Sequence, residues 1–133
     1  MAGSLSPLSL STNLRIYRQT DFIATGAADH DDIFDSGGAS TPVLLKIDNT
    51  ANAAATSYAC FYNAVNPTIG TTAPDIVIPV VGGATVNVAI HRATAIGTPF
   101  ATGLSIACKT AGGTAGTTAP TSDVVLTAVG QAA

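Results

Sequence analysis

The sequence predicts an all-β protein, an antiparallel β-sandwich or jelly-roll-like fold of seven to eight short strands. The first observation is composition: only 10% of the residues are charged and glutamate is absent, while Thr, Val, Ile, Gly and Pro are plentiful. Such a chain is poor in strong helix formers other than alanine and rich in strand and turn formers. The second observation is a period-two alternation of apolar and polar residues, and the third is the glycine- and proline-rich stretches that separate the alternating segments.

The alternating segments predict both the strands and the side chains that face the core. The candidate strands are residues 14–18, 21–25 and 32–34, which are short and weak, then 42–49, 57–65, 75–81, 85–90, 102–110 and 122–129. The side chains expected to face inward are Val43, Leu45, Ile47, Ile76, Ile78, Val80, Val86, Val88, Ile90, Leu104, Ile106 and Cys108. Those expected to face outward are Lys46, Asp48, Thr85, Asn87, Ser105 and Lys109. In residues 57–65, Tyr58, Cys60 and Tyr62 share one face, and Ala59, Phe61 and Asn63 share the other.

The segments between the strands carry turn chemistry. Gly82 and Gly83 lie between two alternating segments and predict a tight hairpin. Pro79 predicts a strand edge or a strand end, because proline cannot donate to a sheet ladder. Residues 66–74 and 109–123 are predicted loops, and they share the string GTTAP. The alanine-rich stretch 49–57 is short and flanked by strand patterns, which favours a connecting loop over a helix.

Charge and hydropathy exclude several classes of protein. The formal net charge is −3, and Arg15 and Arg18 are the only basic residues close together in the sequence, whereas nucleic-acid binding needs clustered Lys or Arg. No run approaches the roughly 18 apolar residues of a membrane-spanning helix. Residues 1–13 lack the features of a signal peptide and are too interrupted by serine to form a core strand. We therefore expect an N-terminal arm over residues 1–13 and one β-sandwich domain over residues 14–133.

The stretch ADHDDIFDSGG, residues 28–38, raises the question of an active or metal site. It does not fit a calcium loop of the EF-hand type, because positions five and six from Asp29 are Ile33 and Phe34 and no glutamate follows. Zinc would need His30 to find partners, and the chain has only one other histidine. A structural cation is the alternative to a solvated turn, which we favour because aspartate is common in exposed turns. We predict no metal, cofactor or catalytic residues.

Nucleophilic chemistry has equally little support. Cys60 and Cys108 lie in apolar strand-like segments without a neighbouring histidine, and we expect buried free thiols rather than a disulfide. No GxSxG elbow or phosphate-binding loop with its lysine is present. The remaining enzymatic hypothesis is a hydrolase that uses His30 or His91 as its base. We predict that the protein is not an enzyme.

Residues 61–129 contain a series of short elements in a characteristic order. They are Phe61, Tyr62 and Asn63, then Pro67, Thr68, Gly70, Thr71 and Pro74, then Ile78, Pro79 and Val80, and finally Phe100, Thr102, Gly103, Leu104 and Ala107. In order and spacing these elements resemble a family of small virion proteins of tailed bacteriophages, over about residues 43 to 129. The chain departs from that pattern in its GGTAGTT loop, where relatives often carry acidic residues, and in its long Ser/Leu arm.

The resemblance implies a β-sandwich on the outer capsid surface of a virion, assembled in the host cytoplasm, with the function of a capsid decoration (cement) protein. Its expected partners are the major capsid protein and copies of itself, with a homotrimer favoured, and no nucleic acid or membrane. Among the residues themselves, we expect the partner contacts at Leu5, Leu8, Leu10, Ile16 and Tyr17. The alternative function is a tail or head-fibre module that binds a host-surface glycan.

Overall fold

The computed structural model describes residues 14–19, 33, 40–89 and 100–132. These residues form strands and loops without a helix. The strands are β1 (Leu14–Gln19), β2 (Ser40–Asp48), β3 (Ser57–Asn63), β4 (Ile76–Val80), β5 (Thr85–Ala89), β6 (Leu104–Lys109) and β7 (Val125–Ala132). The all-β prediction is therefore confirmed.

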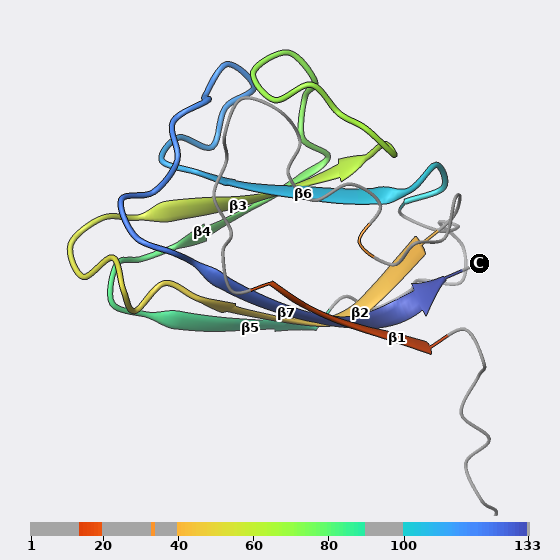
Figure 1. Cartoon of the computed structure of the whole chain (residues 1–133), viewed down its shortest axis with the longest axis horizontal. Helices are drawn as coiled ribbons and strands as arrows, with labels where there is room; N and C mark the ends of the chain where they lie inside the picture. The colour runs from red at the N-terminus through yellow and green to blue at the C-terminus, as the bar shows by residue number, and fades with distance from the viewer. Residues whose placement is uncertain (1–13, 20–32, 34–39, 90–99, 133) are drawn as a thin grey trace, which may run out of the picture.

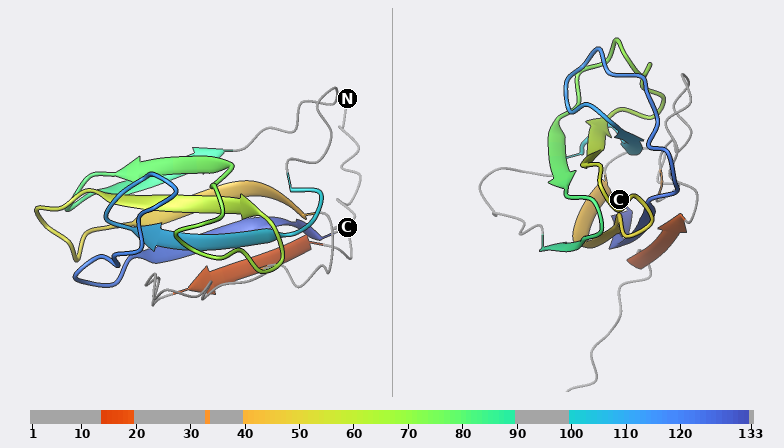
Figure 2. Two further views of the ribbon diagram at one scale, coloured as in Figure 1. Left: turned by 90° about the horizontal axis from the view of Figure 1, so that it is seen from above. Right: turned by 90° about the vertical axis from the view of Figure 1, so that its left-hand side faces the viewer.

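The strands form two antiparallel sheets packed face to face (Figure 1). One sheet has the order β1-β7-β2-β5 and the other has the order β4-β3-β6. The pairs are nested along the chain, because β1 pairs with β7, β2 with β5 and β3 with β4. Nested antiparallel pairs distributed over two sheets are the arrangement of a jelly roll, a long hairpin rolled into a sandwich. Figure 2 shows the two layers from above and from one end.

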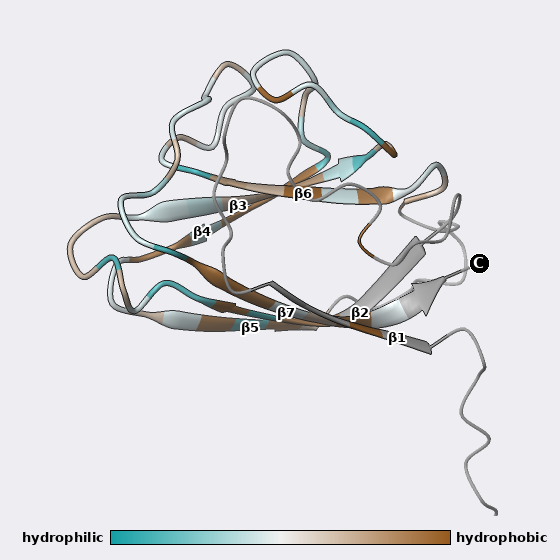
Figure 3. Cartoon of the chain, viewed as in Figure 1, coloured by the Kyte–Doolittle hydropathy of each residue, from teal (hydrophilic) through white to brown (hydrophobic). Residues whose placement is uncertain are grey.

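Period-two alternation supplies the core between the sheets. Leu45 and Ile47 of β2 are fully buried, whereas Lys46 between them is exposed. The predicted inward residues of β4, β5 and β6 also contact this core, and Phe61 of β3 fills its centre. Figure 3 shows the hydrophobic residues concentrated on the strands, with paler loops at the ends. The inward prediction is thus confirmed for these strands, although Ile90 and the side chain of Val43 lie outside the described part of the structure.

The sheet β4-β3-β6 is covered on its outer face as well. All six residues of β6 are buried, including Ser105 and Lys109, which the alternation predicts to face solvent. They do point away from the core, but the loops 64–75 and 110–120 lie over them (Figure 1). We call these two loops the loop cover. Alternation reports which face a residue occupies and cannot report what covers that face.

The prediction of a hairpin at Gly82 and Gly83 is wrong. The turn exists, with the N–H of Ala84 donating to the carbonyl of Val81 at 3.1 Å, but β4 and β5 belong to different sheets. The chain therefore crosses from one layer to the other at this turn. Gly82 passes so close to the loop after β2 that a Cβ there would meet the carbonyl oxygen of Asn52 and come within 2.6 Å of the backbone nitrogen of Ala55.

A buried asparagine holds this crossover in place. The amide of Asn49 donates to the carbonyls of Val80, at 2.9 Å, and Ala55, at 3.1 Å. Its side-chain oxygen accepts hydrogen bonds from Asn52 and Ser57. One side chain thus joins the end of β4 to the loop 49–56, which forms turns and no helix, as predicted. Buried polar groups must find such partners, since an unpaired one costs about 1–3 kcal/mol.

The crossover yields a stability prediction. Gly82→Ala should lower the free energy of unfolding by about 1–3 kcal/mol, because its Cβ would collide with backbone atoms that cannot move aside easily. Gly113→Ala is the matched control, since a Cβ at Gly113 meets nothing within 4 Å. Urea unfolding measures both, and equal stability of the two variants would contradict the close approach at Gly82.

Candidate interaction surface

The outer face of the sheet β1-β7-β2-β5 carries an apolar row that crosses all four strands. Ile16 of β1 pairs with Val129 of β7, Val129 pairs with Leu44 of β2, and Leu44 pairs with Ala89 of β5. We call these four residues the apolar row. Ile16 is 74% exposed and Leu44 is 49% exposed. Because adjacent strands are about 4.8 Å apart, the row runs about 14 Å across the sheet.

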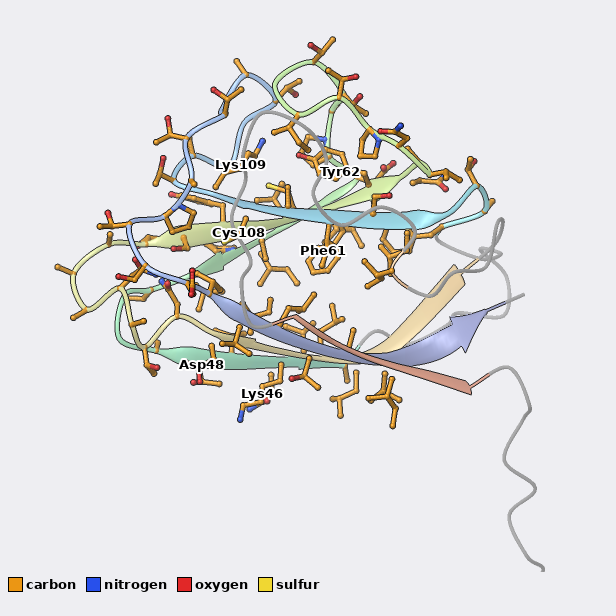
Figure 4. All side chains as sticks on the ribbon, in the orientation of Figure 1. Lys46, Asp48, Phe61, Tyr62, Cys108 and Lys109 are labelled. Carbon is orange, nitrogen blue, oxygen red and sulfur yellow. The ribbon has the colours of Figure 1, made fainter. Side chains whose placement is uncertain are left out.

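The next rows on this face are polar. Lys46 pairs with Thr127 and Asn87, and Asp48 pairs with Val125 and Thr85. Lys46 and Asp48 point away from the other sheet (Figure 4). The outer face therefore changes from aliphatic to charged and hydroxyl-bearing along the strand direction, a composition suited to protein contacts with an apolar centre and a polar rim.

Asp48 has a local structural role on this face. Its carboxylate accepts the N–H of Thr50 at 3.0 Å and the hydroxyl of Thr50 at 2.6 Å. These hydrogen bonds favour the ionised form and hold the pKa of Asp48 below its usual value. The aspartate fixes the turn that follows β2 and is not free to act as a general acid near neutral pH.

The cavities in the described residues do not form a catalytic cleft. A depression of about 120 Å³ is lined by Lys46, Asp48, Val125 and Thr127, well below the roughly 300 Å³ at which ligand pockets begin. A more open one of about 320 Å³ lies between residues 51–55 and Thr121 and Ser122. Its lining has no titratable side chain, and Asn52 already exchanges hydrogen bonds with Ser122.

The loop cover encloses three chemically interesting side chains. Cys60, Tyr62 and Lys109 are fully buried on the outer face of β3 and β6, and Figure 4 shows Tyr62 and Lys109 on the loop side of the sheet. The Nζ of Lys109 donates to the carbonyl of Gly113 at 2.8 Å. Burial raises the pKa of the Tyr62 hydroxyl and of the Cys60 thiol, so neither ionises near neutral pH. These groups pack the loop cover and are closed to substrates.

The two cysteines lie on opposite faces of the same sheet. Ala59 pairs with Cys108 and Cys60 pairs with Ala107, so Cys108 points into the core and Cys60 points toward the loop cover. Their side chains therefore cannot meet in a disulfide. Both are free and buried, as predicted.

The residues that carry the resemblance to virion proteins include several with packing or hydrogen-bonding roles in the described structure. The side-chain oxygen of Asn63 accepts the N–H of Thr102 at 2.8 Å. Gly70 has a φ of 91°, a conformation that favours glycine, and a Cβ there would lie 2.6 Å from a methyl carbon of Thr117. Phe100 is fully buried in the main core. In the described structure, Asn63, Gly70 and Phe100 therefore have architectural roles.

The sequence identified one member of the apolar row and missed another. Ile16 was an expected contact residue and is the most exposed large hydrophobic side chain in the described part of the chain. Leu5, Leu8, Leu10 and the side chain of Tyr17 lie outside that part, as do Asp29, His30 and His91. Leu44 was not predicted, although the signal was present: Leu44 and Leu45 are adjacent, so an alternating strand must place one of them on the solvent face.

Comparisons of the sequence and the structure with protein families, curated proteins and solved structures find no match. Within the ranges that the structure describes, no group of three or more His, Cys, Asp or Glu side chains could hold a metal ion. The same ranges contain no helix with the length and apolarity to cross a membrane. The apolar row is therefore the candidate functional feature that the geometry provides.

The burial of the thiols gives a direct test. Burial raises the pKa of Cys108 to about 12 and also raises that of Cys60, so the native protein should react with a disulfide reagent at pH 8 far more slowly than a free thiol does. In about 6 M guanidinium chloride both should react at once. Fast labelling of Cys60 in the native protein would show that the loop cover opens readily.

Asp48 makes stability depend on pH. Its folded pKa lies below the unfolded value of about 3.9, so the carboxylate stabilises the fold above that pH and loses this effect as the pH falls through the folded pKa. Asp48→Asn should cost less than about 1 kcal/mol at pH 7, because the site is open to solvent. The difference from wild type should shrink at pH 2.5 in urea titrations. Asp123→Asn, at an exposed position, is the control. If the difference in the free energy of unfolding between Asp48→Asn and wild type does not change with pH, the stabilising role of the Asp48 carboxylate is wrong.

Proposed function

We propose that the protein is a structural component of a tailed-bacteriophage virion, a capsid decoration protein that stabilises the shell through protein–protein contacts. The observation that carries the proposal is the apolar row on a rigid sheet, with Leu44 and Ile16 exposed side by side with Val129. Isolated exposed aliphatic residues need no explanation, but four in register across a sheet form a contiguous surface suited to a partner. The ordered resemblance over residues 43–129 supports the virion assignment.

The physical logic of such a protein is selective binding. A molecule that binds only the assembled shell shifts the equilibrium toward assembly by mass action. This requires a stiff scaffold and an adhesive surface, and it requires no perturbed acid or base. The low charge of the chain and the burial of Cys60, Tyr62 and Lys109 under the loop cover agree with this requirement. They also support the proposal that the protein is not an enzyme.

The glycan-binding alternative has no comparable support among the described residues. Sugar recognition commonly uses exposed aromatic rings, whereas Phe61, Tyr62 and Phe100 are fully buried and Tyr58 is half-buried under the loop cover. We therefore propose a protein, and not a glycan, as the binding partner.

The proposal is tested on virions of a phage that encodes this chain. Virions grown without the gene should lose shell density in electron cryomicroscopy maps and release DNA at a lower temperature, and added purified protein should restore both. Added Leu44→Lys should bind with at least about tenfold lower affinity, because covering one leucine contributes about 1.5–3 kcal/mol. Asn87→Lys is the matched control, since it adds the same charge to the neighbouring polar row.

If the density were on the tail instead of the shell, the protein would be a tail component and the capsid decoration role would be wrong. No density on either would overturn the virion assignment altogether.

A further inference from the structure

The two loops of the loop cover are anchored to the sheet in different ways. Loop 64–75 packs Ile69, which is 4% exposed, into the apolar cluster on the outer face of β3 and β6, and the hydroxyl of Ser105 donates to its backbone at 2.6 Å. In the other loop, residues 110–118 read TAGGTAGTT, and none of them is buried or belongs to an apolar cluster. Burial of apolar surface therefore contributes little to holding residues 110–118 on the sheet.

Residues 110–118 form a loop that is closed at its base and rests on the sheet at its middle. The N–H of Thr110 donates to the carbonyl of Thr118 at 3.0 Å, which joins the two ends of the loop. The middle approaches the sheet at Gly112, where a Cβ would lie 2.8 Å from a ring carbon of Tyr58. The base is thus fixed by a backbone hydrogen bond, and the middle lies against a side chain of β3.

The lysine under this loop weakens its closed position. The side chain of Lys109 is fully buried on the loop side of the sheet (Figure 4), and its Nζ donates to the carbonyl of Gly113 at 2.8 Å. A charged lysine has three donors, and within the described part of the chain neither a second acceptor nor a carboxylate contacts this one. Lysine is almost never fully buried without a pairing partner. Water would supply the missing acceptors in an open position, so Lys109 reduces the difference in free energy between the open and closed positions.

We propose that residues 110–118 act as a flap that opens while both sheets remain folded, and that Lys109 sets how often the flap opens. Local opening is expected where a segment has few buried apolar contacts and solvent-exposed backbone hydrogen bonds. In the open position, Lys109 and Tyr58 become accessible on the side of the sandwich opposite the apolar row. The inference goes beyond the proposed function and does not depend on it, because it concerns a different face of the molecule.

The two lysines of the chain are the probes of a first test, because Lys46 is exposed and Lys109 is buried. The full-length native protein is treated with an amine-acylating reagent at several urea concentrations below the unfolding transition, and peptide mass spectrometry gives the rate at each lysine. Lys109 should react more slowly than Lys46 but at least about tenfold faster than the global unfolding constant allows, with little dependence on urea, because local opening exposes little surface. Acylation of Lys109 with the full urea dependence of global unfolding would overturn the flap.

Hydrogen exchange of a peptide that covers residues 110–118 tests the role of Lys109. Lys109→Met keeps an unbranched side chain and leaves no buried donor unpaired, so the flap should be closed more of the time and its amides should exchange about tenfold more slowly. Lys46→Met is the matched control, since it removes the same charge from the exposed lysine, and it should leave the exchange unchanged. Exchange that is unchanged or faster in Lys109→Met would show that the lysine does not promote opening.

A second pair of variants tests the closed position of the flap. Gly112→Ala should speed the exchange about tenfold, because its Cβ collides with the ring of Tyr58 when the flap is closed. Gly113→Ala is the matched control, since a Cβ there meets nothing within 4 Å, and it should not speed the exchange. Equal exchange in the two variants would contradict the contact between the flap and β3.

Discussion

Burial of β3 and β6 on both faces is the constraint on which the rest of the structure depends. Their inner face packs against the second sheet, and their outer face packs under the loop cover through Tyr62, Ile69 and Ala107. A chain with so few charged residues has ample apolar side chains for two such layers. The loops must then follow a fixed path, because Ser105 donates to the carbonyls of Ala64 and Val65 and Lys109 donates to that of Gly113.

This two-sided burial explains where function can reside. It closes the face that carries Cys60, Tyr62 and Lys109, so side chains capable of chemistry serve packing instead. Among the residues that the structure describes, none forms a comparable cover over the outer face of the sheet β1-β7-β2-β5, where Ile16 and Leu44 are exposed. Within the described part of the chain, this face therefore presents the apolar row to a partner, in keeping with the proposal that the protein binds a surface built from other proteins.

The sequence predicts those features that depend on local alternation. Leu45 and Ile47 point inward because strand side chains alternate, and each strand obeys the rule regardless of its partners. The prediction fails at Lys109 and Gly82, where the outcome depends on segments far away in the chain. Lys109 is buried by a loop that its own strand does not specify, and Gly82 forms a crossover because β4 pairs with β3 while β5 pairs with β2. Leu44 is an intermediate case. The two adjacent leucines show that one of them must face solvent, but the sequence does not show what the exposed leucine contacts.

Strand edges connect the fold to its proposed role. β1 and β5 are the edges of the open sheet, and natural proteins usually protect such edges from unwanted pairing. β5 alternates exposed and half-buried residues and is only five residues long, which limits its capacity to pair. The outer face of β1 presents Ile16. A short edge strand β5 that limits pairing and an aliphatic residue on the outer face of β1 therefore favour contact through the face of the sheet over contact through its edges, which is the property that the proposed shell-stabilising protein needs.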